Sequence, residues 1–257
     1  MTASTTEEEL RIELAAAFRL AAIHDLHEGI ANHFSALLPD DRHFLVNPFG
    51  LHFTEIRASD LLVLGLDGNV VRGRGIPAPS AKHIHAPIHR LCPHARVLMH
   101  SHQPYATALT MTGEGRLQWA LQTTVRFYGR VGYDTDYDGV ALGDDVGDRL
   151  AKAISAPVAG ASRESVGTEV LMMGNHGVMT IAPTVAQAYD DLYFLERAAK
   201  TQLLAQASGQ PLRILDRDMV ERTAAQSTIE RFDHGYVDAH FSALVRLLDR
   251  TDRSYRD

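Results

Sequence analysis

Apolar residues at helical spacing predict helices near both ends of the chain and one in the middle. Thr6 and Glu9 have the spacing of a capping box, and the stretch from there towards Gly29 places these apolar side chains on one face: Leu10, Leu14, Phe18 and Ala21. The strongest pattern covers 184–209, where apolar residues recur 3, 4, 3 and 4 positions apart: Val185, Ala188, Leu192, Leu195 and Ala199. Further helices are expected at 144–154 and around 239–248, and the polar residues after 248 are expected to fray.

Between these helices, short apolar runs bounded by turn residues predict strands. They lie at 34–37, 44–46, 61–66, 70–71, 97–102, 117–128, 131–133, 170–173 and 178–181. Asp67 and Gly68 separate two of the runs and indicate a hairpin. Several strands follow one another with no helix between them, which is not the order of a doubly wound parallel sheet. The pattern therefore predicts an α/β fold in which helices cover a mixed, largely antiparallel sheet.

One more helix is expected to begin at Ser80, as its N-cap, and to run towards Leu91. Pro87 lies inside this stretch and lacks the N–H group that a helix interior uses. The helix is therefore expected either to begin late, near His83 or His85, or to be kinked at Pro87.

Composition narrows the class of protein. The chain has 257 residues, 45% of them apolar and 22% charged, as in an ordinary globular protein, and no repeat or linker divides it. We therefore expect a single domain over 1–257, with a core at about 10–210 and a helical C-terminal extension at 211–257. The net charge of −7 argues against a nucleic-acid or membrane partner. No apolar run is long enough to span a bilayer and the first residues are polar and acidic, so we expect a cytoplasmic protein.

Cysteine and histidine usage limits the chemistry. The chain has 14 histidines but one cysteine, Cys92, which excludes a disulfide framework and a cysteine-rich zinc module. The glycine motifs of dinucleotide and phosphate loops are absent, as is the G-x-S-x-G motif of serine hydrolases. Any metal ion would therefore be bound by imidazole and carboxylate groups.

The most informative histidines are His100 and His102, at the end of an apolar strand. Side chains two positions apart on a strand point the same way, so these imidazoles are expected to lie together. His176 follows another apolar strand, in a turn between Gly174 and Gly177 that can present its ring. Three histidines with an open coordination position are typical of a catalytic metal site. The alternative is a pair of surface histidines at a strand end.

A third cluster lies in the helix expected after Pro79. His85 and His89 are four positions apart, so on a helix they share a face and could form a second metal pair. The alternative is that one bonds to a backbone carbonyl and the other faces solvent. Six other histidines are scattered, and most of them are expected at the surface or an interface: His24, His27, His33, His43, His52 and His94.

Several segments occur in a specific order and spacing. They are Asn32-His33-Phe34-Ser35, Phe44-Leu45-Val46-Asn47-Pro48-Phe49-Gly50, Ala58-Ser59-Asp60-Leu61, His85-Ala86-Pro87-Ile88-His89, Cys92-Pro93-His94-Ala95-Arg96 followed by the strand to His102, Asn175-His176-Gly177, and Leu195-Glu196-Arg197-Ala198. With them the chain resembles the class II aldolase/adducin family, from about Phe18 to about Gln210.

The resemblance implies a three-layer αβα sandwich and a homotetramer with active sites at subunit interfaces. It also implies one divalent metal ion per chain on His100, His102 and His176. Zn2+ is the first choice for such a site, and Mn2+, Fe2+, Co2+ or Ni2+ could also bind. The family's anion-binding positions, which would hold a small-molecule substrate, correspond to Asn32, Ser35, Asn47, Gly50 and Ser80.

Two positions depart from relatives such as fuculose-phosphate aldolase and ribulose-phosphate epimerase. The sugar-phosphate aldolases have an acid/base glutamate four residues before the position of His85, where this chain has Ala81, followed by Lys82. Phe49 replaces a polar serine of the family's phosphate loop. Both changes favour the adducin-like branch and argue against the glutamate-dependent step and a phosphorylated substrate.

Two functions fit these features. The first is a metal-dependent carbon–carbon lyase that performs aldol cleavage or decarboxylation on a small hydroxy-carbonyl or carboxylic acid substrate, through a metal-stabilised enolate. Without the glutamate, its candidate acid/base residues are Lys82, His83, His85 and Tyr128. For Lys82 the alternative is a solvent-facing or anion-pairing role. The second function is a non-catalytic, adducin-like oligomeric module, which would have no reason to keep three metal ligands.

Overall fold

The computed structural model describes residues 6–161 and 167–257, whose strands form one eight-stranded sheet. The strands are β1 (His33–Leu37), β2 (His43–Val46), β3 (Leu62–Gly65), β4 (Val70–Arg72), β5 (Val97–Ser101), β6 (Val131–Asp134), β7 (Val170–Met173) and β8 (Gly177–Ala182). Their order is β4-β3-β2-β1-β5-β8-β7-β6, and every neighbouring pair is antiparallel except β6 and β7. The predicted mixed, largely antiparallel sheet is confirmed.

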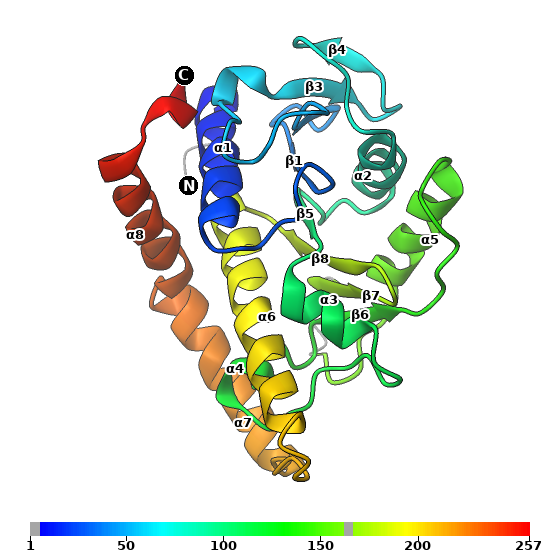
Figure 1. Cartoon of the computed structure of the whole chain (residues 1–257), viewed down its shortest axis with the longest axis vertical. Coiled ribbons are helices and arrows are strands. Elements are labelled where there is room, and N and C mark those ends of the chain that lie inside the picture. Colours follow the sequence, from blue (N-terminus) through cyan, green and yellow to red (C-terminus); the bar gives the residue numbers. More distant parts are fainter. Residues whose placement is uncertain (1–5, 162–166) are drawn as a thin grey trace.

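Helices cover both faces of this sheet (Figure 1). They are α1 (Glu7–Ile23), α2 (Pro79–Leu91), α3 (Pro104–Thr110), α4 (Gln122–Val125), α5 (Asp144–Ser155), α6 (Val185–Gln206), α7 (Arg217–Thr228) and α8 (Tyr236–Thr251). Apolar side chains of α2 and α5 form one buried cluster with β5, β7 and β8, and those of α1 and α6 form another on the opposite face. Helix α8 packs outside α1 and α6. The predicted three-layer αβα arrangement is therefore confirmed.

Strand alternation decides which polar side chains face α2. In β5, Met99 packs with α1 and α6, whereas Leu98 packs with α2 and α5, so His100 lies on the α2 side. In β1, Phe34 packs with α1, so His33 and Ser35 also lie on the α2 side. Because His33 is the register partner of His100, the polar residues of both strands come together beneath α2.

The expected strand at 117–128 is wrong. Part of this stretch forms the short helix α4, and the rest packs against α6 instead of the sheet. Gln202 of α6 accepts a hydrogen bond from the backbone N–H of Gln118 and donates one to the carbonyl of Arg116. A helix side chain thus satisfies backbone groups that a strand would have paired with a neighbouring strand.

Helix α2 begins earlier than expected, and Ser80 is not its N-cap. The N-cap is Ala78, and Pro79 occupies the first helical position, where its fixed φ favours a helix start. The helix continues through Pro87. A Cβ atom at Gly147 of α5 would lie 2.2 Å from the carbonyl oxygen of His83, so α5 packs directly over the turn that Pro87 disrupts.

Both ends of the chain also differ from expectation. Helix α1 ends at Ile23, well before Gly29. Asp25 adopts a left-handed conformation (φ 57°), and the N–H of Leu26 donates to the carbonyl of Ala21. These two features form a Schellman motif, which ends the helix. The last residues do not fray, since Tyr255 is fully buried. No helix in the described part of the chain is long and apolar enough to cross a membrane.

Candidate metal centre

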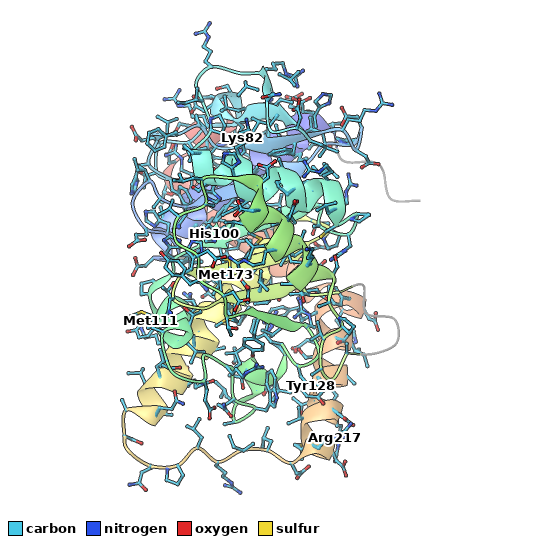
Figure 2. The ribbon with its side chains drawn as sticks, turned by 90° about the vertical axis from the view of Figure 1, so that its right-hand side faces the viewer. Lys82, His100, Met111, Tyr128, Met173 and Arg217 are labelled. Atoms are coloured by element: carbon cyan, nitrogen blue, oxygen red, sulfur yellow. The ribbon has the colours of Figure 1, made fainter. Side chains whose placement is uncertain are left out.

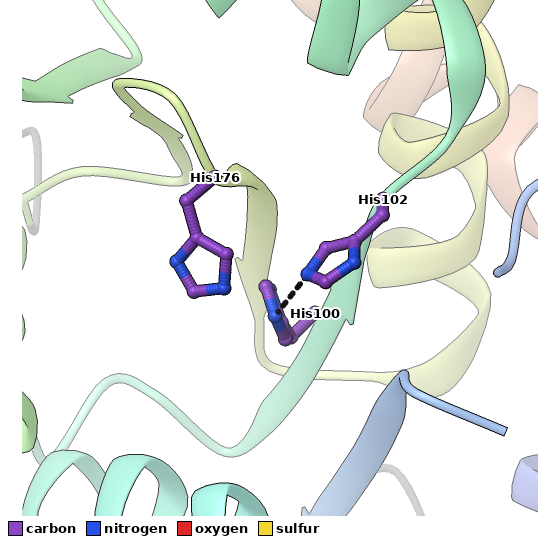
Figure 3. A group of neighbouring side chains, drawn as sticks. All are labelled: His100, His102 and His176. Atoms are coloured by element: carbon purple, nitrogen blue, oxygen red, sulfur yellow. Dashed lines mark hydrogen bonds between the residues drawn. The ribbon is translucent and has the colours of Figure 1, made fainter. Parts of the chain in front are cut away.

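Three histidines predicted as metal ligands come together at one end of the sheet. His100 lies one residue before the end of β5, His102 directly follows the strand, and His176 lies in the turn between β7 and β8 (Figure 3). One ring nitrogen from each lies within 4.8 Å of the others. His100 is buried, and the other two are partly exposed, so the group can be reached from solvent.

The turn that carries His176 is built differently from the prediction. Asn175, and neither of the flanking glycines, adopts the left-handed conformation, with φ 54°. Gly177 is required for a different reason, which is close packing. A Cβ atom at this position would lie 2.7 Å from Cδ2 of His102 and 2.6 Å from the carbonyl oxygen of Ser101. The absence of a side chain at 177 therefore allows the two histidine-bearing segments to approach.

Hydrogen bonds determine which nitrogen of two of these rings carries the proton. Nδ1 of His100 donates to the carbonyl of Val178 (3.0 Å), and Nδ1 of His102 donates to the carboxylate of Glu28 (2.6 Å). Both acceptors lack a proton to give, so each neutral ring is protonated at Nδ1 and has a lone pair at Nε2. The two Nε2 atoms are 3.1 Å apart.

Two lone pairs that face each other at this distance repel, and a cation between them removes the repulsion. The pKa values also favour the ligand form of the rings. Burial, with additional charge repulsion from His102 and Arg149, lowers the pKa of His176 to about 4, and burial holds the pKa of His100 well below its ordinary value. His100 and His176 thus favour the neutral form that binds a metal ion, and the donor set of the three histidines suits a divalent transition metal or zinc.

A buried chain of hydrogen bonds lies beside the triad, between β1 and α2. We call it the histidine–serine chain, and its members are Ser80, His33, His85, Ser35 and His89. The joined atoms are Ser80 Oγ and His33 Nε2 (3.3 Å), His33 Nδ1 and His85 Nε2 (2.7 Å), His85 Nδ1 and Ser35 Oγ (2.5 Å), and Ser35 Oγ and His89 Nε2 (2.7 Å). The far end is fixed by His89 Nδ1, which donates to the carbonyl of Ala95 (2.8 Å).

This anchor sets the direction of every bond in the chain. The carbonyl of Ala95 can only accept, so Nε2 of His89 is an acceptor and the hydroxyl of Ser35 donates to it. Ser35 then accepts from Nδ1–H of His85. Nε2 of His85 in turn accepts from Nδ1–H of His33, whose Nε2 remains an acceptor.

The chain is uncharged and touches the triad. Burial lowers the pKa of His33 to about 3 and that of His89 to about 4, and it holds the pKa of His85 well below its ordinary value. The ring centroids of His33 and His100 are 4.9 Å apart. The prediction that His85 and His89 share a helix face is confirmed, and the expectation that His33 lies at the surface or an interface is wrong, since it is buried within the fold.

Two of the predicted substrate-binding residues offer unused hydrogen-bonding groups near the triad. Oδ1 of Asn32 accepts from the backbone N–H of His102 (3.4 Å), and Nδ2 of Asn47 donates to the carbonyl of Asn32 (3.3 Å). Within the described residues, Nδ2 of Asn32 and Oδ1 of Asn47 are buried and lack a partner. Such groups are expected to bind something that the protein chain does not supply. Gly50 is exposed in the loop after Asn47, with φ 94°.

The other predicted catalytic residues contact parts of the chain other than the triad. The side chain of Lys82 packs against Gly68, and Nδ1 of His83 bonds to Asp144 of α5 (2.6 Å). Tyr128 packs on Trp119 and lines a cavity of about 570 Å³. Figure 2 shows Lys82, His100 and Tyr128 well separated along the long axis of the molecule.

Sequence reasoning missed His33 and Glu28 in this region. His33 lies two positions before the predicted Ser35 in a fully buried strand, which is a signal that could have placed His33 on the same polar face. Glu28 gave no such signal, because its contact with His102 joins residues 74 positions apart.

Comparison with known proteins agrees with this fold. Residues 12–203 match the family model of the class II aldolase and adducin N-terminal domain. An adducin-related protein of Schizosaccharomyces pombe is 35% identical over 266 residues, covering 98% of this chain and 78% of that protein. A decarboxylase of Streptomyces niveus, NovR, is 28% identical over 172 residues, covering 66% of this chain and 59% of that enzyme.

Solved structures give the same relationship. An aldolase II superfamily protein from Pseudomonas syringae superposes with a TM-score of 0.87 at 33% identity, covering 100% of this chain and 98% of that one. An L-fuculose 1-phosphate aldolase from Glaciozyma antarctica superposes with a TM-score of 0.79 at 26% identity, covering 98% and 93% of the two chains. The chain therefore belongs to the class II aldolase and adducin family.

Proposed function

We propose that this member of the class II aldolase and adducin family is a divalent-metal-dependent carbon–carbon lyase. One observation carries the proposal: ring nitrogens of His100, His102 and His176 converge within 4.8 Å, and two of the rings are held in the tautomer that directs Nε2 into the site. A site of three neutral imidazoles leaves a coordination position for substrate. Zn2+ is the proposed ion, one per chain.

The proposed substrate is a small hydroxy-carbonyl compound or carboxylic acid. A bound divalent ion supplies a Lewis acid that stabilises the negative charge formed when a bond next to a carbonyl or carboxylate breaks. Asn32 would donate from its unpartnered Nδ2 to a substrate oxygen, and Asn47, Gly50 and Ser80 would line the same side of the site. The hydroxyl of Ser35 is already bonded to two histidines, so its role would be to hold the histidine–serine chain.

Aldol cleavage and decarboxylation make different demands on the protein. Aldol cleavage requires a base for the substrate hydroxyl, whereas decarboxylation requires only a proton donor after the bond has broken. The chain has Ala81 in place of the aldolase glutamate, which favours decarboxylation. Similarity to a named decarboxylase and to a named aldolase supports the wider class of lyase.

The proposed homotetramer, with sites at subunit interfaces, bears on the remaining candidates. Lys82 and Tyr128 lie away from the triad of their own chain, so a direct catalytic role would bring these two from a neighbouring subunit, and the ring of His83 is bonded to Asp144. Of the four predicted acid/base residues, His85 is linked to the triad within one chain, through His33.

Metal analysis of the purified protein tests the proposal. We expect about one divalent ion per chain, lost in both His100→Ala and His176→Ala and kept in the control His43→Ala, whose ring pairs with Asp40 on the surface. Incubation with candidate hydroxy-carbonyl compounds and acids should then give cleavage or CO2 release that depends on the ion. The proposal would be refuted if the purified protein contained no divalent ion and the substitutions at His100 and His176 left its properties unchanged.

That negative result would favour the second candidate, a non-catalytic adducin-like oligomeric module. The observation in its favour is the 35% identity to an adducin-related protein over nearly the whole chain. The metal content separates the two functions, because a binding module of this fold has no need of a bound ion.

A further inference from the structure

We infer that Glu28 is a positioning residue of the metal centre, which holds His102 so that its Nε2 is directed at the bound ion. The inference rests on the proposed metal centre. It assigns a role to a residue of the loop between α1 and β1 that contributes no ligand. Its basis is the 2.6 Å contact between the carboxylate of Glu28 and Nδ1 of His102.

The loop that carries Glu28 is fastened to the end of β5 at two points. On one side of Glu28, the hydroxyl of Ser101 donates to the carbonyl of Leu26 (2.7 Å). On the other side, Oδ1 of Asn32 accepts from the N–H of Glu28 (2.6 Å) and from the N–H of His102 (3.4 Å). One amide oxygen thus ties the backbone of Glu28 to the backbone of the histidine that its side chain contacts.

The local backbone also turns at Glu28. Its carbonyl accepts from the N–H of Ala31 (2.9 Å), and Gly29 has a positive φ of 52°. The turn and the two fastening points fix where the side chain starts, so the carboxylate reaches His102 with few rotatable bonds left to order.

The three ligands are not equally supported by hydrogen bonds. His100 is oriented by a backbone carbonyl, and His102 by a carboxylate. Carboxylate partners of this kind fix the tautomer of a ligating histidine and raise its basicity, and their loss typically weakens metal binding by about 10- to 100-fold. The negative charge of Glu28 also offsets part of the charge of a divalent ion held by three neutral rings.

The same contact contributes little to the stability of the fold. The Glu28 side chain is 66% exposed, and contacts of exposed charged groups are weak because water and salt screen them. An effect on metal affinity can therefore be separated from an effect on folding.

The test is a Zn2+ titration of the full-length protein in competition with a chromogenic chelator, together with thermal melting of the metal-free form. We expect Glu28→Ala to weaken Zn2+ binding by about 10- to 100-fold, while Glu28→Gln, whose amide oxygen can still accept, loses less. The matched control is Glu8→Ala, which removes an exposed carboxylate from the first turn of α1 and should leave the affinity unchanged. The melting temperature of the metal-free protein should be the same in the two Glu28 variants as in the unsubstituted chain.

Two results would overturn the inference: Zn2+ affinity of Glu28→Ala within twofold of the unsubstituted chain, or a metal-free Glu28→Ala protein that melts at a clearly lower temperature. Failure of the proposed function looks different, because the unsubstituted chain would then bind no Zn2+. A chain that binds Zn2+ regardless of the residue at 28 keeps the metal centre and removes only the role of Glu28.

Discussion

Substitution of Ser35 by alanine tests the histidine–serine chain most directly. The hydroxyl accepts from His85 and donates to His89, and all three residues are buried. Ser35→Ala therefore leaves an N–H group of one ring and a lone pair of the other without a partner. The site lies inside the fold, so bulk water does not replace the lost bonds.

The two rings cannot pair with each other once the hydroxyl is gone. His33 and His85, which do bond directly, have ring centroids 4.7 Å apart, whereas those of His85 and His89 are 6.4 Å apart. Each buried polar group left unpaired costs roughly 1–3 kcal/mol. Two such groups lower the free energy of unfolding by roughly 2–6 kcal/mol.

Chemical denaturation of the metal-free protein measures this difference, and thermal melting should show a fall of at least about 4 °C. The control is Ser242→Ala, an exposed serine of α8, which should change the free energy of unfolding by no more than about 0.5 kcal/mol. If Ser35→Ala were as mild as this control, the hydrogen bonds inferred for the chain would be absent in solution.

Two further predictions follow from the same region. Burial lowers the pKa of His33 to about 3 and of His89 to about 4 from an ordinary 6.5, so below pH 6.5 the unfolded chain binds more protons than the folded one. The free energy of unfolding should therefore fall as the pH drops from 6.5 towards 4, by about 1.4 kcal/mol for each pH unit and each histidine. Denaturation curves that do not change over this pH range would contradict the burial of these rings. Gly177→Ala should weaken Zn2+ binding, because its Cβ would lie 2.7 Å from the His102 ring and displace it, whereas Gly113→Ala, where nothing lies within 4 Å, should not. Equal Zn2+ affinities of the two variants in the chelator titration would mean that the ring is not confined by Gly177.

Features that depend on local spacing could be predicted from the sequence. Alternation along one strand places His100 and His102 together, and helical spacing places His85 and His89 on one face. Helix α6 begins at the predicted cap, where Thr184 accepts from the N–H of Gln187. In each case the interacting residues are neighbours on one element, so the element's geometry alone decides the outcome.

Features that depend on packing between elements could not be predicted in this way. The stretch 117–128 has the apolar content of a strand, but Gln202 of α6 bonds to the backbone at its start, at Arg116 and Gln118. The contacts of Ser35 with His85 and His89 span 50 and 54 positions and depend on how α2 sits over β1. A pattern within a single segment carries no information on these partners.

The surroundings of Ala81 show how the absence of the expected acid/base glutamate changes the charge on the side of α2 that faces the sheet. Ala81 is almost fully buried in an apolar cluster with Phe44 of β2 and Leu62 of β3. The structure therefore has no space beside the metal ligands for a carboxylate from position 81. An ionised glutamate at 81 would lie among hydrocarbon side chains, at a large desolvation cost that favours the neutral acid. One turn later on the same helix, the side chain that faces β1 is His85, a neutral member of the histidine–serine chain. The face of α2 towards β1 is thus uncharged at His85. Under the proposed lyase function, a proton transferred on this side of the site would pass through neutral hydroxyl and imidazole groups, which is a second reason to test acids that lose CO2 as substrates.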